Sequence, residues 1–213
     1  HWDLPQALEE KGGWANRKII DWFSSYASFV TKEYGDKVKN WMVLNEPMAF
    51  TAVGYFAGVH APGYIAPAKF QKVAHYTSIV QATGGRIIRQ NVSDAYIGTT
   101  LSCSPIRAKG PRHNKAAHRA DILLNRLYIE PLLGMGYPTE GFAFIKGIEQ
   151  HIEPGDMELV QFDFDFIGLQ NYTQTVVRNY ILPYVWLLEQ KAKNDLNKIK
   201  KIVSLEFQLI KET

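Results

Sequence analysis

The sequence predicts an α/β fold built around a parallel sheet. Helical and strand segments alternate along the chain, three of each, and this order is typical of βαβ units. The strand segments are short unbroken apolar runs, as expected of parallel strands that are covered on both faces. Each strand is also followed by a longer segment than a crossover needs, and parallel barrels build their pockets from such segments.

Apolar residues at helical spacing predict three helices. The first covers residues 16–34, with Asn16 as a suitable N-cap and Gly35 as a stop signal. The second covers residues 67–90 and begins with a proline, which suits the first turn of a helix. The third covers residues 114–133. Strands are expected at the apolar runs of residues 41–44, 95–101 and 164–169.

The composition excludes several classes of protein. Of the 213 residues, 46% are hydrophobic and 21% are charged, which suits a packed core rather than a disordered chain. No run approaches the roughly 18 apolar residues of a membrane helix, so no membrane partner is expected. The net charge of +3 shows no basic field that would bind nucleic acid. One cysteine and no visible signal segment favour the cytoplasm, and the sequence does not predict the oligomeric state.

Polar and aromatic residues stand at three expected strand ends, and this combination suits a sugar, whose hydroxyls need hydrogen bonds and whose faces are apolar. Glu46 follows the strand at 41–44, so its carboxyl group leaves the apolar layer and enters the pocket mouth. Pro47 is expected to keep Glu46 extended. Apolar surroundings disfavour a charged carboxylate, so such a group can donate a proton. The residues at the three strand ends are His1 and Trp2, Asn45 and Glu46, and Asn171 and Tyr172.

Other chemistries have little support in the sequence. His113 and His118 are five residues apart and the other histidines are scattered, so no metal site is predicted. No Gly-x-Ser-x-Gly occurs, and Cys103 has no partner signature nearby. No Gly-x-Gly-x-x-Gly follows a strand, and no cofactor is predicted. Taken alone, Asn45-Glu46-Pro47 is a short string that is also compatible with a purely structural role.

A series of short motifs runs along residues 1 to about 186. In order, the motifs are His1 to Leu8, Gly12-Gly13-Trp14, Tyr34-Gly35-Asp36 with Val38 and Trp41, Asn45-Glu46-Pro47, Gly54-Tyr55 with Gly58, Ala61-Pro62-Gly63, Asn125-Arg126, Pro131-Leu132-Leu133, Tyr137-Pro138, and Phe166-Ile167-Gly168 leading to Asn171-Tyr172. Together they resemble the family-one glycoside hydrolases of the β-glucosidase type, whose fold is a (β/α)8 TIM barrel.

This resemblance implies hydrolysis of β-linked glycosides with retention of configuration, and Glu46 as the general acid/base. Retaining hydrolysis needs two carboxyl groups about 5–5.5 Å apart, one acting as acid and one as nucleophile. The other implied roles are Asn45 at the sugar 2-hydroxyl, His1 at another hydroxyl, Trp2 as part of the pocket wall, Tyr172 as a hydrogen-bond partner of the nucleophile, and Asn171 as a lining residue of the same subsite.

The chain also departs from the family pattern. The nucleophile of the family lies in an Ile/Val-Thr-Glu-Asn-Gly segment, and none occurs here. Asp163 and Asp165 stand at the entry of their strand and are expected at the opposite end of the barrel from Glu46. Residues 1–186 are therefore expected to form a partial barrel, about the third to sixth strands, followed by a divergent Lys-rich helical tail at 187–213. A complete barrel needs about 250 residues.

Three functions remain open at this point. The first is a β-glycosidase that is incomplete in these 213 residues and inactive on its own, because the nucleophile segment is absent. The second is a catalytically dead sugar-binding or scaffold protein that has kept half of the pocket. The third is a half-barrel that assembles as a dimer, which ranks last because the tail shows no designed interface. The sequence leaves the sugar specificity open, including plain against 6-phosphorylated sugars.

Overall fold

The computed structural model describes residues 3–178. They form two compact units, one made of residues 3–103 and 123–170 and the other of residues 104–122 and 171–178. The expected tail at 187–213 and its boundary with the barrel lie outside the described residues, as do His1 and Trp2.

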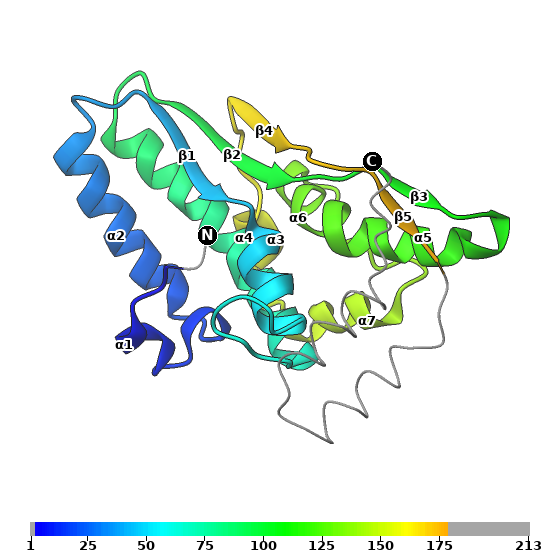
Figure 1. The fold of residues 1–213 in the computed structure, drawn as a ribbon. Coiled ribbons are helices and arrows are strands. Elements are labelled where there is room, and N and C mark those ends of the chain that lie inside the picture. The colour runs from blue at the N-terminus through cyan, green and yellow to red at the C-terminus, as the bar shows by residue number, and fades with distance from the viewer. Residues whose placement is uncertain (1–2, 179–213) are drawn as a thin grey trace. The chain divides into compact units, whose positions relative to one another are not determined.

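The first unit is built on a parallel sheet of three strands in the order β1-β2-β4 (Figure 1). Trp41 lies opposite Ile97, and Thr99 lies opposite Ile167. The three predicted strands are therefore present close to their expected bounds, and their parallel pairing is confirmed. Their bounds are Asn40–Asn45 for β1, Tyr96–Ser102 for β2 and Phe166–Gln170 for β4.

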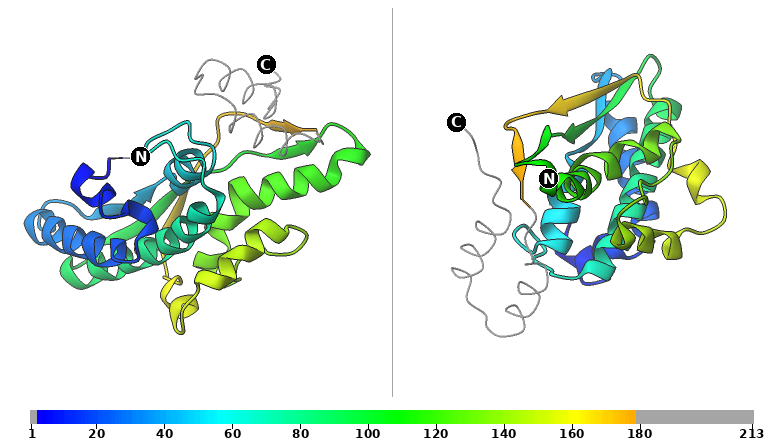
Figure 2. Two further views of the ribbon diagram at one scale, coloured as in Figure 1. Left: turned by 90° about the horizontal axis from the view of Figure 1, so that it is seen from below. Right: turned by 90° about the vertical axis from the view of Figure 1, so that its right-hand side faces the viewer.

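Two long helices, α2 (Ile19–Tyr34) and α4 (Pro67–Asn91), lie side by side on one face of this sheet (Figure 2). Both were predicted from their apolar spacing. The other helices of the first unit are short: α1 (Gln6–Glu9), α3 (Pro47–Thr51), a π-helical turn at Ala52–Phe56, α6 (Leu127–Ile129), α7 (Ala143–Lys146) and α8 (Asp156–Leu159), with 3-10 turns at Gly13–Ala15, Pro131–Leu133 and Gly147–His151.

The core of the first unit lies between the sheet and these two helices. Its residues come from every layer, so burial of their apolar surface fixes the helices on the sheet. One buried cluster consists of Ile19, Leu44, Phe50, Tyr76 and Val80. A second consists of Ile88, Val92, Ala95 and Ile97, and Trp41, Val43, Phe162 and Phe164 pack against it.

The opposite face of the sheet carries apolar side chains that the described residues leave exposed. Met42 on β1 and Tyr96 on β2 are both exposed, and the Tyr96 ring stacks on Phe166 of β4 with centroids 5.1 Å apart. Exposed apolar surface of this kind usually marks an interaction face or an aggregation hazard.

The third predicted helix, residues 114–133, is not a single α-helix. It is α-helical over α5 (Asn114–Asp121), widens to a π-helical turn at Ile122–Arg126, and returns to α-helix in α6. Pro131 has no N–H to donate, so the segment closes in a 3-10 turn instead of continuing. Gly134 then ends the segment in a left-handed conformation.

The second unit contains a two-stranded parallel sheet that the sequence did not predict. Its strands are β3 (Ile106–Ala108) and β5 (Thr175–Val177), and α5 packs beside them, preceded by a 3-10 turn at Pro111–His113. Strands of three residues are too short to give an apolar run, so periodicity cannot reveal them.

A buried polar network joins four parts of the first unit. The Arg17 guanidinium donates to both carboxylate oxygens of Asp156, at 2.9 Å to Oδ2. His75 Nε2 lies 2.8 Å from Asp156 Oδ2, and His75 Nδ1 lies 2.8 Å from the Tyr137 hydroxyl. Burial lowers the pKa of His75, and the donors around Asp156, led by Arg17, hold the pKa of that carboxyl below its ordinary value against the opposing effect of burial. His75 is therefore neutral near pH 7, donating from Nε2 and accepting at Nδ1.

Candidate active site at the strand ends

The carboxyl ends of the three parallel strands meet at one edge of the first unit. Asn45 is the last residue of β1 and lies opposite Thr100 on β2, and Ser102 lies opposite Gln170, the last residue of β4. Polar side chains therefore gather at this edge, where parallel α/β proteins build their binding sites.

A β-bulge in β1 sets the direction of the side chains that follow it. Met42 pairs with Gly98 and Asn45 with Thr100, so β1 uses one residue more than β2 between these pairs. The Leu44 carbonyl oxygen lies 3.2 Å from the Thr99 hydroxyl and 3.3 Å from the Thr100 hydroxyl. Two threonine hydroxyls of β2 thus approach the Leu44 carbonyl beside the bulge. Bulges of this kind redirect side chains beside functional sites.

Glu46 has a left-handed backbone, with φ 47° and ψ 66°, where the sequence predicted an extended one. The prediction was wrong because the chain passes from β1 directly into α3, which begins at Pro47, and a left-handed residue makes this sharp turn. The Glu46 N–H donates to the Thr100 carbonyl at 2.9 Å, and the Glu46 carbonyl accepts from Ala49 at 2.8 Å. A non-glycine residue in this region is strained, and such strain concentrates at functional sites.

Replacing Glu46 by glycine is expected to raise the free energy of unfolding by about 0.5–1 kcal/mol, because glycine avoids the left-handed penalty of about 1–2 kcal/mol but loses more chain entropy. Chemical denaturation of the two chains measures the difference. Glu46→Ala is the matched control, since alanine removes the carboxylate and keeps the strain. A loss of stability in Glu46→Gly would contradict this prediction, because it would show that the Glu46 side chain stabilises the fold.

The Asn45 amide forms the centre of a hydrogen-bond cluster. Its Oδ1 accepts from the Thr100 hydroxyl at 2.7 Å and from Gln170 Nε2 at 2.8 Å. Thr100 and Gln170 were not predicted as site residues, although Gln170 directly precedes the predicted Asn171. The signal that could have found them is their position at strand ends, in register with Asn45. Gln170 Oε1 is buried and has no hydrogen-bond partner among residues 3–178.

Asn171 and Tyr172 follow β4 directly and begin the second unit. Both are exposed, Tyr172 to 78%. Their predicted roles in the sugar subsite stay predictions. His1 and Trp2 lie outside the described residues, so their predicted contacts stay predictions.

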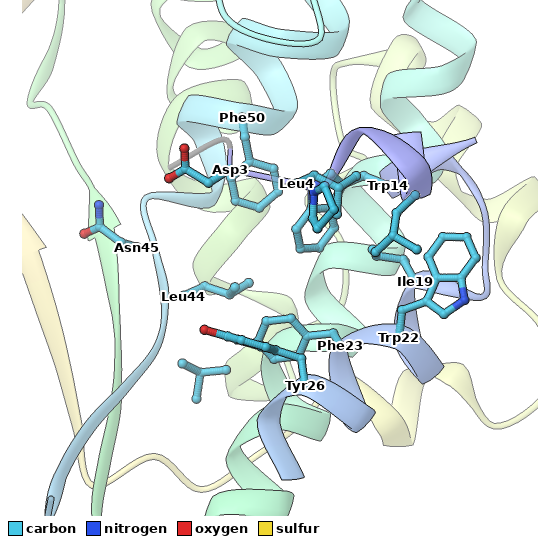
Figure 3. A pocket seen from close by; sticks show the side chains of 13 residues that line it. Asp3, Leu4, Trp14, Ile19, Trp22, Phe23, Tyr26, Leu44, Asn45 and Phe50 are labelled. Atoms are coloured by element: carbon cyan, nitrogen blue, oxygen red, sulfur yellow. The ribbon is translucent and has the colours of Figure 1, made fainter. Parts of the chain in front are cut away.

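An apolar pocket of about 380 Å³ lies beside β1. Figure 3 shows the Leu44 side chain directed to the aromatic residues that line the pocket, whereas the Asn45 amide, which borders it, points away from them. The Trp14 and Phe50 rings in its wall have centroids 4.6 Å apart. The aromatic wall and the Asn45 amide therefore lie on different sides of β1.

Asp165, which the sequence set aside as a second carboxylate for the site, directly precedes β4 at its amino end. Its carboxylate accepts from the Ile97 N–H at 2.7 Å and pairs with Arg89 at 2.9 Å. These donors hold the pKa of Asp165 below its ordinary value. The Asp165 carboxylate therefore has a structural role, and it lies at the end of the sheet opposite Glu46, as predicted.

Within residues 3–178, no group of three or more His, Cys, Asp or Glu side chains could hold a metal ion. None of the helices in this part of the chain is both long and apolar enough to span a membrane.

The fold and this edge define a class of protein: parallel α/β proteins that place polar and acidic side chains at the carboxyl ends of their strands. The family model of Glycosyl hydrolase family 1 matches residues 1–206, and the chain belongs to this family.

Curated relatives are similar over most of this chain. Beta-glucosidase A of Thermotoga maritima is 36% identical over 185 residues, and beta-glucosidase A of Acetivibrio thermocellus is 34% identical over 183 residues. Each alignment covers 84% of this chain and 41% of the relative, so the chain spans less than half the length of these proteins.

Solved structures agree with the sequence comparison. A psychrophilic beta-glucosidase from Micrococcus antarcticus has a TM-score of 0.78 and 36% identity, with 83% of this chain and 38% of that chain covered. The Thermotoga maritima beta-glucosidase in complex with deoxynojirimycin has a TM-score of 0.77 and 29% identity, with 92% and 50% covered.

Proposed function

We propose that this chain is part of a β-glycosidase of the β-glucosidase type and that Glu46 is its general acid/base. The observation that carries the proposal is the position of Asn45 and Glu46 at the carboxyl end of a parallel strand, with Glu46 in a strained backbone conformation, in a chain that belongs to family 1. Relatives named beta-glucosidase support the substrate class, a β-linked glucoside.

The proposed chemistry assigns a proton transfer to Glu46. Its carboxyl group protonates the glycosidic oxygen while a second carboxylate attacks the sugar from the other side, and Glu46 then takes a proton from the water that releases the sugar. Asn45 is proposed to bind the sugar 2-hydroxyl and His1 another hydroxyl. Asn171 is proposed to line the subsite, Tyr172 to hold the nucleophile, and Trp2 to shape the pocket.

The proposal extends the described sheet to a partial (β/α)8 barrel that lacks the second carboxylate. No Ile/Val-Thr-Glu-Asn-Gly segment occurs in the 213 residues, and Asp165 is committed at the other end of its strand. Without a nucleophile the retaining reaction has no covalent intermediate. These 213 residues are therefore expected to bind a glucoside analogue without cleaving a glucoside.

The test has a turnover arm and a binding arm, both on the 213-residue chain. The chain is expected to release no product from an aryl β-glucoside whose phenol is a poor leaving group. Turnover that Glu46→Gln abolishes would refute the predicted inactivity. In the binding arm, calorimetry with deoxynojirimycin is expected to show binding that Asn45→Ala weakens about five- to tenfold, the usual worth of one hydrogen bond. Binding unaffected by Asn45→Ala would place the sugar elsewhere and contradict the proposed site.

A sugar-binding or scaffold protein is the second candidate, because the hydrogen-bond cluster around Asn45 can bind a hydroxyl without a nucleophile. Both candidates predict binding without turnover by this chain. They differ at the level of the gene, since an open reading frame that continues through a nucleophile segment favours the glycosidase.

A further inference from the structure

We propose that Gln170, together with Thr100, is a positioning residue that fixes the direction of the Asn45 amide. This inference rests on the proposed function, because it assigns the amide to a sugar hydroxyl. Its own basis is the hydrogen-bond cluster at the strand ends, in which one amide oxygen receives two donors from two neighbouring strands.

The two bonds decide which end of the amide faces which partner. The Thr100 hydroxyl and Gln170 Nε2 lie 2.7 and 2.8 Å from the same atom of Asn45, and Gln170 can offer a donor there only through its NH₂ group. An amide oxygen has two acceptor sites, and these donors fill both. With Gln170 Nε2 directed at Asn45, rotating the Asn45 amide by half a turn would place its NH₂ group against the Gln170 NH₂, a donor against a donor. The cluster therefore holds Oδ1 inward and keeps Nδ2 as the donor end.

The strands give this arrangement its rigidity. Thr100 is buried in the middle strand, and Gln170 is half-buried at the end of the next one. Asn45, by contrast, is exposed at the end of β1. The exposed Asn45 side chain is therefore fixed by hydrogen bonds from two strands, β2 and β4. Preorganisation of a donor in this way lowers the entropic cost of binding a ligand hydroxyl.

The consequence is that Gln170 affects a bound sugar through Asn45. Gln170→Glu tests this, because it keeps an oxygen in place of Oε1 and replaces only the Nε2 donor. The glutamate carboxylate would face the Asn45 oxygen, so the amide is expected to rotate and to present its oxygen outward. Thr100→Val removes the second donor with little change of shape.

A double-mutant cycle on deoxynojirimycin affinity separates positioning from other effects. In the wild-type background, Gln170→Glu is expected to weaken binding about fivefold or more, as loss of one oriented hydrogen bond does. In the Asn45→Ala background the same change is expected to lack this loss, so that only the effect of the added charge remains. The charge that glutamate adds is present in both backgrounds and cancels in the comparison. Leu169→Ala, on the opposite face of the same strand, is the control and is expected to leave affinity unchanged.

The outcomes distinguish this inference from the proposed function. If Asn45→Ala leaves the affinity unchanged, the proposed site is wrong. If Asn45→Ala weakens binding but Gln170→Glu does so equally in both backgrounds, the site stands and the positioning role is overturned. Thermal unfolding of every variant checks that each one folds.

A measurement without ligand keeps the inference testable even if the chain does not bind deoxynojirimycin. The two Asn45 Nδ2 protons give a pair of ¹H–¹⁵N resonances that is assigned by its loss in Asn45→Asp. The pair is expected to shift or to double in Gln170→Glu and in Thr100→Val, and to stay in place in Leu169→Ala. An unchanged pair in Gln170→Glu would overturn the positioning role.

Discussion

Replacing Asp156 by alanine is expected to lower the free energy of unfolding by about 3–5 kcal/mol, the usual cost of removing one partner of a buried ion pair. Asp156 is 1% exposed and accepts from three elements at once, through Arg17, His75 and the Glu153 N–H. Alanine would leave all three donors without this acceptor. Because the Arg17 side chain is 31% exposed and can reach water, the loss is expected near the lower end of this range.

Glu153→Ala is the matched control for this prediction. Glu153 also pairs with Arg17, at 3.3 Å, but its side chain is exposed. Exposed ion pairs contribute about 0–1 kcal/mol, so this variant is expected to unfold almost as the wild type does. Urea denaturation of the three chains gives the comparison. Equal losses in the two variants would mean that the burial of Asp156 adds nothing, and that the network is not what joins α8 to α4.

Much of the first unit could be predicted because its elements are long and regular. Apolar residues recur at helical spacing over 67–90, and the run at 41–44 is short, apolar and unbroken. The structure reproduces these segments as α4 and β1. Asn16 was predicted as the N-cap of α2, whereas the helix begins at Ile19. The Asn16 side chain accepts from the Lys18 N–H at 3.0 Å, so it caps the turn that leads into the helix.

The site itself could be predicted only in part, because its geometry depends on register. That Glu46 follows a strand is visible in the sequence, but its left-handed backbone arises from the direct passage of β1 into α3. Thr100 and Gln170 contact Asn45 because a bulge shifts the pairing of β1 by one residue, and a bulge leaves no apolar signature. Arg17, His75 and Asp156 are widely spaced in the chain, and only the fold brings their charges together.

The second large effect is expected at Phe70, in the first turns of α4. Its side chain is fully buried, with its ring centroid 5.5 Å from that of Phe56 and 5.9 Å from that of Phe144. Phe56 ends the π-helical turn that follows α3, and Glu46 precedes α3. The aromatic group formed by Phe56, Phe70 and Phe144 thus anchors the far end of the segment that begins at the proposed acid/base.

Phe70→Ala is expected to cost about 3–5 kcal/mol of unfolding free energy, because it removes a fully buried ring and leaves a cavity between two others. Phe29→Ala makes the same chemical change on α2, where the side chain is 68% exposed, and is expected to cost about 0.5 kcal/mol or less. If Phe70→Ala folds, the backbone amides of residues 52–56 are expected to exchange with solvent faster than in Phe29→Ala, since their packing partner is gone. Unchanged exchange at 52–56 in a destabilised Phe70→Ala chain would show that the turn after Glu46 is held by other contacts, such as the buried hydrogen bond of 2.8 Å between the Thr51 and Tyr128 hydroxyls.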